Sequence, residues 1–225
     1  MTPKRLSVPE PGVREIAHQL AYKIARERLA EIKDFEQQCH KSGTRYLPAE
    51  KSIVIDHLNR VYKISLPGGE VTFIDSDETV PTRDKILILH YFICAKGTPL
   101  TGQLITYKEL QEGINYYPTF FKRAIDPIIN NFKDEPEKLP KIAEIIGGHK
   151  SDYGDIAVTI NAFAKVPLTF VLWRGDKEFP TEGNILFDST ISDYLPTEDV
   201  TILCEIIAWK LVRALKTGGD TPGSR

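Results

Sequence analysis

The stretch from Ile86 to Ala95, ILILHYFICA, constrains the fold more than any other part of this sequence. Its residues are apolar on every side of a helix, whereas a helix at the surface of a domain keeps one polar face. A helix start at Pro81–Asp84 and a stop at Lys96-Gly97 bound the stretch. We therefore predict a helix at the centre of a hydrophobic core, and a chain of 225 residues is long enough to bury one.

The N-terminal region has helical spacing. Residues 1–10 are expected to be poorly ordered, and apolar residues at helical spacing then predict one long helix from about residue 12 to 42. Its buried stripe is expected to include Ile16, Leu20 and Ile24, because these residues recur once per turn.

Three other regions carry strand or helix patterns. Short β-type runs between residues 44 and 80 predict strands, and Pro67-Gly68-Gly69 predicts a hairpin turn between the last two. Residues 155–160 alternate like a half-buried strand, and residues 166–173 are their expected antiparallel partner. A C-terminal helix is expected to begin at Thr197.

These patterns fit one α+β domain. No internal repeat and no linker divides the chain, so we expect a single domain over residues 1–216. It would contain a long N-terminal helix, a small antiparallel sheet, the central apolar helix and the C-terminal helix. The small polar residues from 217 to 225 are predicted to form a disordered tail.

The charge balance and the cysteines argue against several kinds of site. A formal net charge of −2 gives no basic surface for nucleic acid or an anionic membrane. No apolar run is long enough to span a membrane, and the charged N-terminus lacks the apolar segment of a signal peptide, so a cytoplasmic location is expected. Cys39, Cys94 and Cys204 are far apart and form no C-x-x-C pair, so we expect neither a structural zinc nor an iron–sulfur cluster.

His90 is the one strongly polar side chain within the apolar helix. It could be a core histidine whose ring nitrogen bonds a backbone carbonyl, as buried polar groups usually do. It could instead be a neutral imidazole that offers one nitrogen to a metal, including a metal held in a macrocycle, while an acceptor orients the other nitrogen.

Residues 114–121 contain four aromatic side chains within six positions, and Tyr107 is close by in the sequence. Such rings could form a platform for a flat ligand, because they present a large rigid area at low entropic cost. They could equally fill the space beneath a loop, as small hydrophobic clusters commonly do.

An acidic corner follows the apolar strand that ends at Trp173. Asp176, Glu178 and Asp188 could place two carboxylates close together for acid–base chemistry or for a hard cation. The alternative is structural: Asp176 sets a turn, Glu178 pairs with Arg174, and Asp188 caps the next short helix. No nucleophile motif accompanies the carboxylates, which argues against an enzyme.

Several segments together resemble one known family. They are His90-Tyr91, Gly147-Gly148 before Gly154-Asp155, Val166-Pro167-Leu168, Leu172-Trp173 with Gly175-Asp176 and Glu178-Phe179-Pro180, Leu186-Phe187-Asp188, and Tyr194-Leu195-Pro196 with Glu198-Asp199. Their order resembles family 3786 of the domains of unknown function, over roughly residues 13–216. The resemblance places the chain among proteins of anaerobic bacteria and archaea. Some members carry a four-cysteine iron–sulfur module similar to that of corrinoid iron–sulfur proteins, a pattern from which this sequence departs.

The residues and this resemblance together imply a cofactor-binding protein rather than an enzyme. We expect it to hold a corrinoid such as cobalamin, or a related tetrapyrrole, in anaerobic one-carbon metabolism, with His90 as the axial metal ligand. The resemblance implies a methyltransferase or an iron–sulfur redox protein as the partner. The expected cofactor site comprises His90, Tyr91, Tyr107, Tyr116, Tyr117, Phe120, Trp173, Asp176, Glu178, Phe179 and Asp188.

Two other functions are open at this point. The chain could be an interaction module that docks on a redox or methyl-transfer partner through its acidic corner and has no ligand of its own. It could also be an enzyme that uses the carboxylates of Asp176, Glu178 and Asp188.

Overall fold

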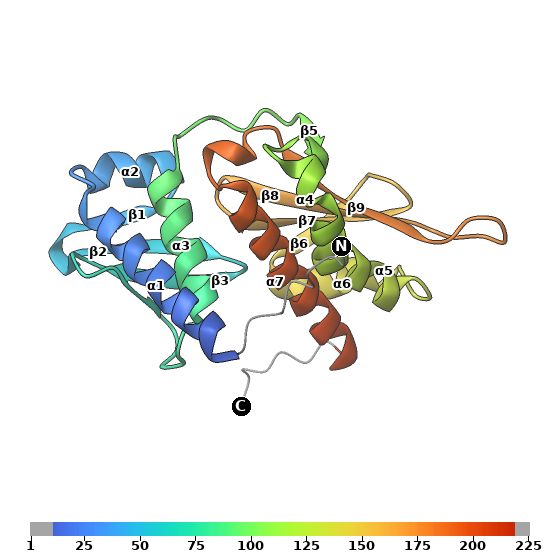
Figure 1. Cartoon of the computed structure of the whole chain (residues 1–225), viewed down its shortest axis with the longest axis horizontal. Coiled ribbons are helices and arrows are strands. Elements are labelled where there is room, and N and C mark those ends of the chain that lie inside the picture. The colour runs from blue at the N-terminus through green and yellow to red at the C-terminus, as the bar shows by residue number, and fades with distance from the viewer. Residues whose placement is uncertain (1–10, 219–225) are drawn as a thin grey trace, which may run out of the picture.

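The computed structural model of the chain describes residues 11–218, which form two antiparallel sheets with helices packed on them (Figure 1). The segment 1–10, expected to be poorly ordered, lies outside the described residues. Most of the tail expected from 217 to 225 lies outside them as well, since the described part ends in a turn at Thr217 and Gly218.

The first sheet is a four-stranded meander. Each strand pairs with the next along the chain, because two-residue and four-residue turns join consecutive strands at the same edge. Leu58 and Asn59 form the two-residue turn between β2 and β3 with φ values of 49° and 61°, the backbone that such a tight hairpin requires. The turn predicted at Pro67–Gly69 is confirmed. The strands are β1 (Arg45–Leu47), β2 (Ser52–His57), β3 (Arg60–Ser65) and β4 (Glu70–Phe73).

Three helices pack with this sheet: α1 (Pro11–Ala30), α2 (Phe35–Ser42) and α3 (Thr82–Cys94). The prediction for α3 is confirmed, since buried side chains such as Leu87, Leu89 and Phe92 occur around its whole circumference. This helix lies between α1 on one side and α7 (Thr197–Lys216) on the other (Figure 1).

The prediction of a single long N-terminal helix was wrong in two respects. The chain leaves the helix after α1 and begins α2 with Asp34, whose Oδ1 accepts the backbone N–H of Gln37 at 2.8 Å as an N-cap. The stripe expected to be buried, which includes Ile16 and Leu20, is exposed. α1 instead faces α3 with the side that carries Ala25 and Leu29, where a small side chain lets the two helices approach.

The second sheet has five strands in the order β5-β9-β8-β7-β6. The antiparallel pair predicted from the alternation pattern is confirmed as β7 and β8, which pair from Ile156 opposite Leu172 to Phe163 opposite Val166. One small sheet was expected and two are present, so the prediction was incomplete. The strands are β5 (Leu104–Thr106), β6 (Gly148–Ser151), β7 (Ile156–Phe163), β8 (Val166–Trp173) and β9 (Glu182–Asp188).

Helical segments cover the second sheet, and α7 packs against several of them. A π-helical turn, Phe121–Ile125, joins α4 to α5 without a break in the helical path. The other segments are α4 (Gly113–Phe120), α5 (Asp126–Phe132), α6 (Lys138–Ala143) and the short 3₁₀ turns Pro48–Glu50, Tyr107–Glu109, Glu144–Ile146 and Ile191–Asp193.

One hydrophobic core runs through both halves of the molecule, so the α+β single-domain prediction is confirmed. The β8–β9 hairpin is the exception to this compact arrangement, since its tip projects well beyond the body (Figure 1). No helix within residues 11–218 is both long enough and apolar enough to cross a membrane.

Candidate functional site

The start of α7, from Thr197 to Thr201, has two faces with different surroundings. A helix advances about 100° per residue, so Thr197, Glu198 and Thr201 share one side while Asp199 lies about 200° around from Thr197. The first side lines a pocket, and Asp199 on the opposite side contacts His90 of α3. The same short segment therefore builds two distinct environments.

His90 is oriented by a carboxylate. Its Nδ1 lies 2.7 Å from Oδ2 of Asp199, and because a carboxylate only accepts, Nδ1 carries the hydrogen and donates it. The Asp199 side chain is 7% exposed and that of His90 is 20% exposed. The interpretation of His90 as a core histidine bound to a main-chain carbonyl is therefore wrong. Its ring is fixed through one nitrogen and reaches solvent in part.

Cys94 lies one helical turn beyond His90 on α3 and is partly exposed. Burial raises the pKa of its thiol, while the charge of Arg28 and a hydrogen bond from Arg28 act in the opposite direction. The negative charge of Asp199 also raises the pKa of this thiol, so the carboxylate is close enough to be felt there. His90 and Cys94 of α3 thus lie near Asp199 of α7, and these three residues define the α3–α7 seam. The guanidinium of Arg28 reaches this seam from α1.

Tyr91 points away from this seam into the core. Its ring stacks on Phe163 with 4.1 Å between centroids, and its hydroxyl donates to the carbonyl oxygen of Ser42 at 2.5 Å. Burial raises the pKa of the Tyr91 phenol. Tyr91 was predicted to contact a cofactor, but it is fully enclosed and has a packing role.

The pocket on the other face of α7 has a volume of about 290 Å³. Its apolar floor is the stacked pair of Tyr107 and Phe120, whose centroids lie 3.8 Å apart with an interplanar angle of 8°. The Tyr107 hydroxyl is 2.7 Å from that of Thr201, which ties this floor to α7. The pocket is lined by Tyr107, Gln111, Glu112, Tyr116, Thr119, Phe120, Arg123, Thr197, Glu198 and Thr201.

The backbone around this pocket is unusual at two places. Glu112 has a φ of 58°, a left-handed conformation that costs a non-glycine residue free energy. The π-helical turn that follows α4 positions Arg123, and π-helical turns frequently occur at functional sites. Sequence reasoning missed Glu112 and Arg123, because neither belongs to a recognisable pattern.

Tyr117 lies outside this lining. Its ring faces Nζ of Lys108 at 4.2 Å and Phe121 at 6.2 Å. Five aromatic residues from the 107–121 segment and the Trp173 corner were predicted to line one site: Tyr107, Tyr116, Tyr117, Phe120 and Trp173. The structure brings Tyr107, Tyr116 and Phe120 together in the pocket.

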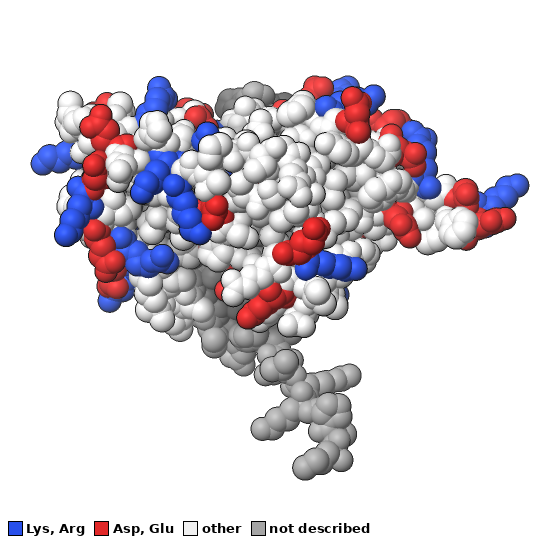
Figure 2. Space-filling view, turned by 90° about the horizontal axis from the view of Figure 1, so that it is seen from above, with Lys and Arg blue, Asp and Glu red and all other residues white. Residues whose placement is uncertain are grey.

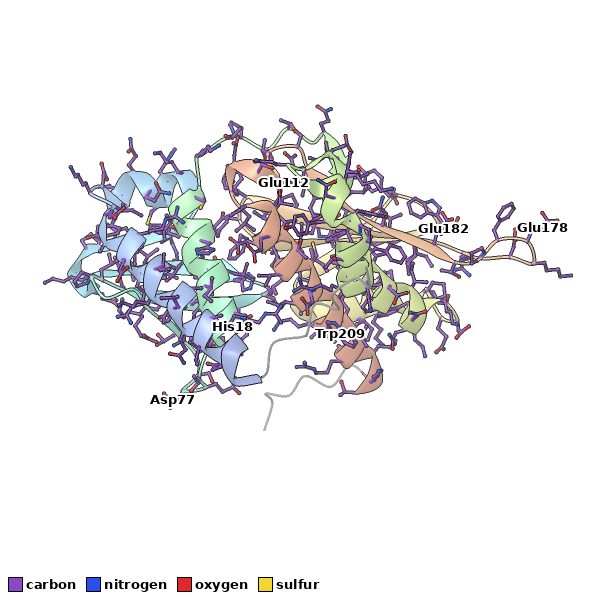
Figure 3. All side chains as sticks on the ribbon, viewed as in Figure 1. His18, Asp77, Glu112, Glu178, Glu182 and Trp209 are labelled. Carbon is purple, nitrogen blue, oxygen red and sulfur yellow. The ribbon has the colours of Figure 1, made fainter. Side chains whose placement is uncertain are left out.

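The acidic corner is at the end of the β8–β9 hairpin, and Glu178 lies at the projecting tip (Figure 3). Asp176 organises the turn, since its Oδ1 accepts the backbone N–H groups of Glu178 at 2.7 Å and Phe179 at 2.8 Å. These bonds lower the pKa of the Asp176 carboxyl. The turn-setting interpretation of Asp176 is confirmed. The expected Glu178–Arg174 pair is wrong, because Arg174 lies 3.6 Å from Glu137 instead.

Asp188 is far from that tip. It ends β9, a strand of seven residues, so at about 3.3 Å per residue it lies about 20 Å from the start of the strand. Its buried carboxylate accepts the backbone N–H groups of Thr101, Gly102 and Thr190. Paired catalytic carboxylates lie within about 10 Å of one another, so the expected grouping of Asp188 with Asp176 and Glu178 is wrong.

The predicted residues therefore occupy separate regions. His90 lies at the α3–α7 seam, three aromatic residues line the pocket, and the acidic corner is at the hairpin. Seen from above, charged side chains of both signs gather at the hairpin, while the middle of the same face has few (Figure 2). Within the described part of the chain, no group of three or more His, Cys, Asp or Glu side chains is arranged to hold a metal ion.

Two of the segments on which the family resemblance rests meet in space. His90-Tyr91 contacts the segment from Tyr194 to Asp199, through the His90–Asp199 hydrogen bond and through the Tyr91 and Tyr194 rings, whose centroids are 6.0 Å apart.

A search of the curated proteins finds no significant match, and a search of the solved structures finds none either. Residues 34–209 match the model of DUF3786, described as a domain of unknown function. Because that match spans more than three quarters of the sequence and includes both segments, the chain belongs to the DUF3786 family.

Proposed function

We propose that this protein binds a corrinoid or a related metal tetrapyrrole, with His90 as the axial ligand of the metal. The observation that carries the proposal is the 2.7 Å hydrogen bond from His90 Nδ1 to Asp199. Histidines that bind metals usually donate their other ring N–H to a carboxylate or a carbonyl, which fixes the ring and increases the basicity of the ligating nitrogen.

The surroundings of His90 suit that role. The imidazole is mounted on α3, the most buried helix, and its partner Asp199 belongs to the first turn of α7, so both groups are held by rigid elements. The ring is partly exposed, and among the described residues its Nε2 forms no hydrogen bond, so this nitrogen could bind a metal. One imidazole supplies one ligand, so the metal would arrive with its other ligands in the macrocycle, as in haem and corrinoid proteins.

We assign the macrocycle to the α3–α7 seam and not to the pocket. The pocket volume of about 290 Å³ lies at the lower limit for a drug-sized ligand. Arg28, next to Cys94, would supply a cation for a carboxylate or phosphate group of the cofactor. With the family resemblance as support, the proposal extends to a cytoplasmic role in anaerobic one-carbon metabolism, with a methyltransferase or an iron–sulfur redox protein as the partner.

The test is a visible spectrum. Purified protein is incubated with hydroxocobalamin or with haem in separate samples, and an absorbance band that co-elutes with the protein on gel filtration is expected for one of them. His90→Ala should abolish or shift the band, and Asp199→Asn should weaken binding by about 10-fold to 100-fold. His149→Ala, on an exposed histidine of β6, is the matched control. A band that is unchanged in folded His90→Ala protein would rule out the axial role.

A second candidate is a docking module, and one observation favours it. Phe179 at the hairpin tip is 67% exposed, and the bonds to Asp176 hold the turn in one conformation before any partner binds. Glu178→Lys and Phe179→Ser both preserve Asp176. If the hairpin docks, these variants should lose a partner captured by the wild type, while the spectrum with cofactor stays unchanged. Equal capture by all three proteins would exclude docking through the hairpin.

A further inference from the structure

We propose that the pocket between α4 and α7 is a second, separate binding site, and that it takes a small planar ligand with a cationic nitrogen group such as an amidinium or an aromatic ammonium. The site is spatially separate from His90, because Asp199 and the pocket-lining residues occupy opposite sides of α7.

The size of the cavity limits the ligand. A volume of about 290 Å³ lies at the lower end of the range of about 300–1,000 Å³ that small-molecule sites have. A single ring or a compact fused ring with a short substituent fits in that space. The concave shape, an aromatic floor and a few polar groups are the usual features of small-molecule sites.

The exposed ring of Tyr116 on the pocket wall suits a planar cationic ligand. Tyr116 is 56% exposed, and its ring has no aromatic or cationic partner among residues 11–218. The floor beside it is the Tyr107–Phe120 stack, whose rings are already paired with each other. A cationic ring placed against Tyr116 would gain a cation–π contact that the protein does not satisfy internally.

The charges of the lining favour a positive ligand. Glu112 and Glu198 lie at the rim, and throughout the described range neither carboxylate forms an ion pair or a side-chain hydrogen bond. Arg123 is the one cation of the lining, but its guanidinium binds Glu205, with Nε at 2.8 Å from Oε2. The side-chain charges of the lining are thus two unpaired carboxylates and one guanidinium that is already paired, and they favour a cation over an anion.

The rim is held in place before any ligand binds. A Cβ at Gly113 would lie 2.0 Å from the carbonyl oxygen of Tyr107, so only glycine permits this close approach of the two segments. The Thr197 hydroxyl donates to the carbonyl oxygen of Gln111 at 3.0 Å and joins α7 to the loop before α4. A rigid site loses less entropy when a ligand binds.

Benzamidine, its neutral analogue benzamide and the anion benzoate form a matched set of probes. Each is titrated into ¹⁵N-labelled protein while amide correlations are followed by NMR. Benzamidine should shift the amides of residues 112–117, 119–120 and 197–201 with a dissociation constant on the order of a millimolar, as expected for a fragment of this size. Benzamide should bind about tenfold more weakly and benzoate should cause no shift in these amides.

Variants distinguish the contribution of the two carboxylates from that of the Tyr116 ring. Glu198→Gln and Glu112→Gln should each weaken benzamidine about tenfold without affecting benzamide, whereas Glu178→Gln at the hairpin tip is the control and should have no effect. Tyr116→Ala should weaken benzamidine roughly threefold, with Tyr153→Ala as the exposed-tyrosine control.

Three outcomes would overturn the site: no pocket shifts at several equivalents above a millimolar, equal binding of benzoate, or full benzamidine affinity in the Glu112→Gln, Glu198→Gln double variant. Folded His90→Ala protein should still bind benzamidine, because His90 contributes no atom to the pocket lining. The result with His90→Ala thus keeps a failure of the tetrapyrrole proposal distinct from a failure of this one.

Discussion

His57 lies between the two sheets and His90 lies between α3 and α7, and their rings are held by different kinds of partner. Nδ1 of His57 is 2.9 Å from the carbonyl oxygen of Ala162, and the ring stacks on Phe163 at 4.3 Å. Within residues 11–218, its buried Nε2 has no hydrogen-bond partner. His90 by contrast binds a carboxylate and keeps a partly exposed ring.

The difference separates an enclosed imidazole with a packing role from one whose ring is partly exposed to solvent. Burial lowers the pKa of His57 to about 4; the bond to Ala162 opposes this shift, and the charge of Lys210 adds to it. His57 is thus a neutral core side chain, the description first considered for His90. A carboxylate partner and a partly exposed ring distinguish His90. Three of the four experiments below test that distinction, and the other concerns a second buried polar group.

The largest expected effect is the loss of stability in acid through His57. The unfolded imidazole takes up a proton near pH 6.5, whereas the folded one does so only near pH 4. The unfolded state binds more protons between these values, so the free energy of unfolding should fall by about 3 kcal/mol as the pH drops through this window. Urea denaturation at several pH values measures it. His57→Phe should remove this part of the slope, and identical slopes in the two proteins would contradict the assignment.

Breaking the carboxylate–imidazole bond should have the next largest effect. Asp199→Asn replaces a hydrogen bond to a charged acceptor by a neutral one in a buried setting, and we expect a loss of about 2 kcal/mol in the free energy of unfolding at pH 7. Glu198→Gln changes the adjacent, exposed acid and should stay within about 0.5 kcal/mol of the wild type. Equal denaturation midpoints for both variants would mean that Asp199 does not hold the ring.

A smaller effect of opposite sign is expected at Ser52, the other buried polar group without a partner in the described residues. Ser52→Ala removes a hydroxyl that forms no hydrogen bond, so it should stabilise the fold by about 1 kcal/mol. Ser42→Ala should destabilise it, because the Ser42 hydroxyl donates to the carbonyl oxygen of Gln38 at 2.8 Å. Thermal denaturation of both variants makes the comparison. Destabilisation by Ser52→Ala would indicate a partner for its hydroxyl.

The smallest effect concerns the charge near His57. Lys210→Gln removes a positive charge that helps to lower the pKa of His57, so this pKa should rise, by less than the effect of burial. An NMR titration of the imidazole resonances measures the shift. A pKa that stays the same or falls would contradict the contribution of Lys210 to the shift.

The elements of the fold could be predicted where the pattern was local. The all-round apolar character of α3, the alternation of β7 with β8, and the acid that sets the hairpin turn at Asp176 are each contained in fewer than twenty consecutive residues. The face of α1 could not be predicted, because the helix carries both an Ile and Leu stripe and an Ala-containing face, and packing on α3 selects the second.

The site depended on contacts between distant residues, and local periodicity cannot reveal these. His90 and Asp199 are 109 positions apart, and His57 and Ala162 are 105 apart. The sequence singled out His90 because it interrupts an apolar helix, but its partner could be found only after α7 was placed beside α3. His57 gave no such signal, since it ends a short strand in a mixed stretch.

The first turn of α7 also has a mechanical consequence. Its backbone is one rigid unit, so a ligand that pulls on Thr197 from one side must carry Asp199 with it on the other. A ligand on one side of α7 that changes the affinity on the other side is itself affected by the same coupling free energy. The ¹⁵N resonances of the His90 imidazole should therefore report whether the pocket is occupied, although the ring does not line the pocket.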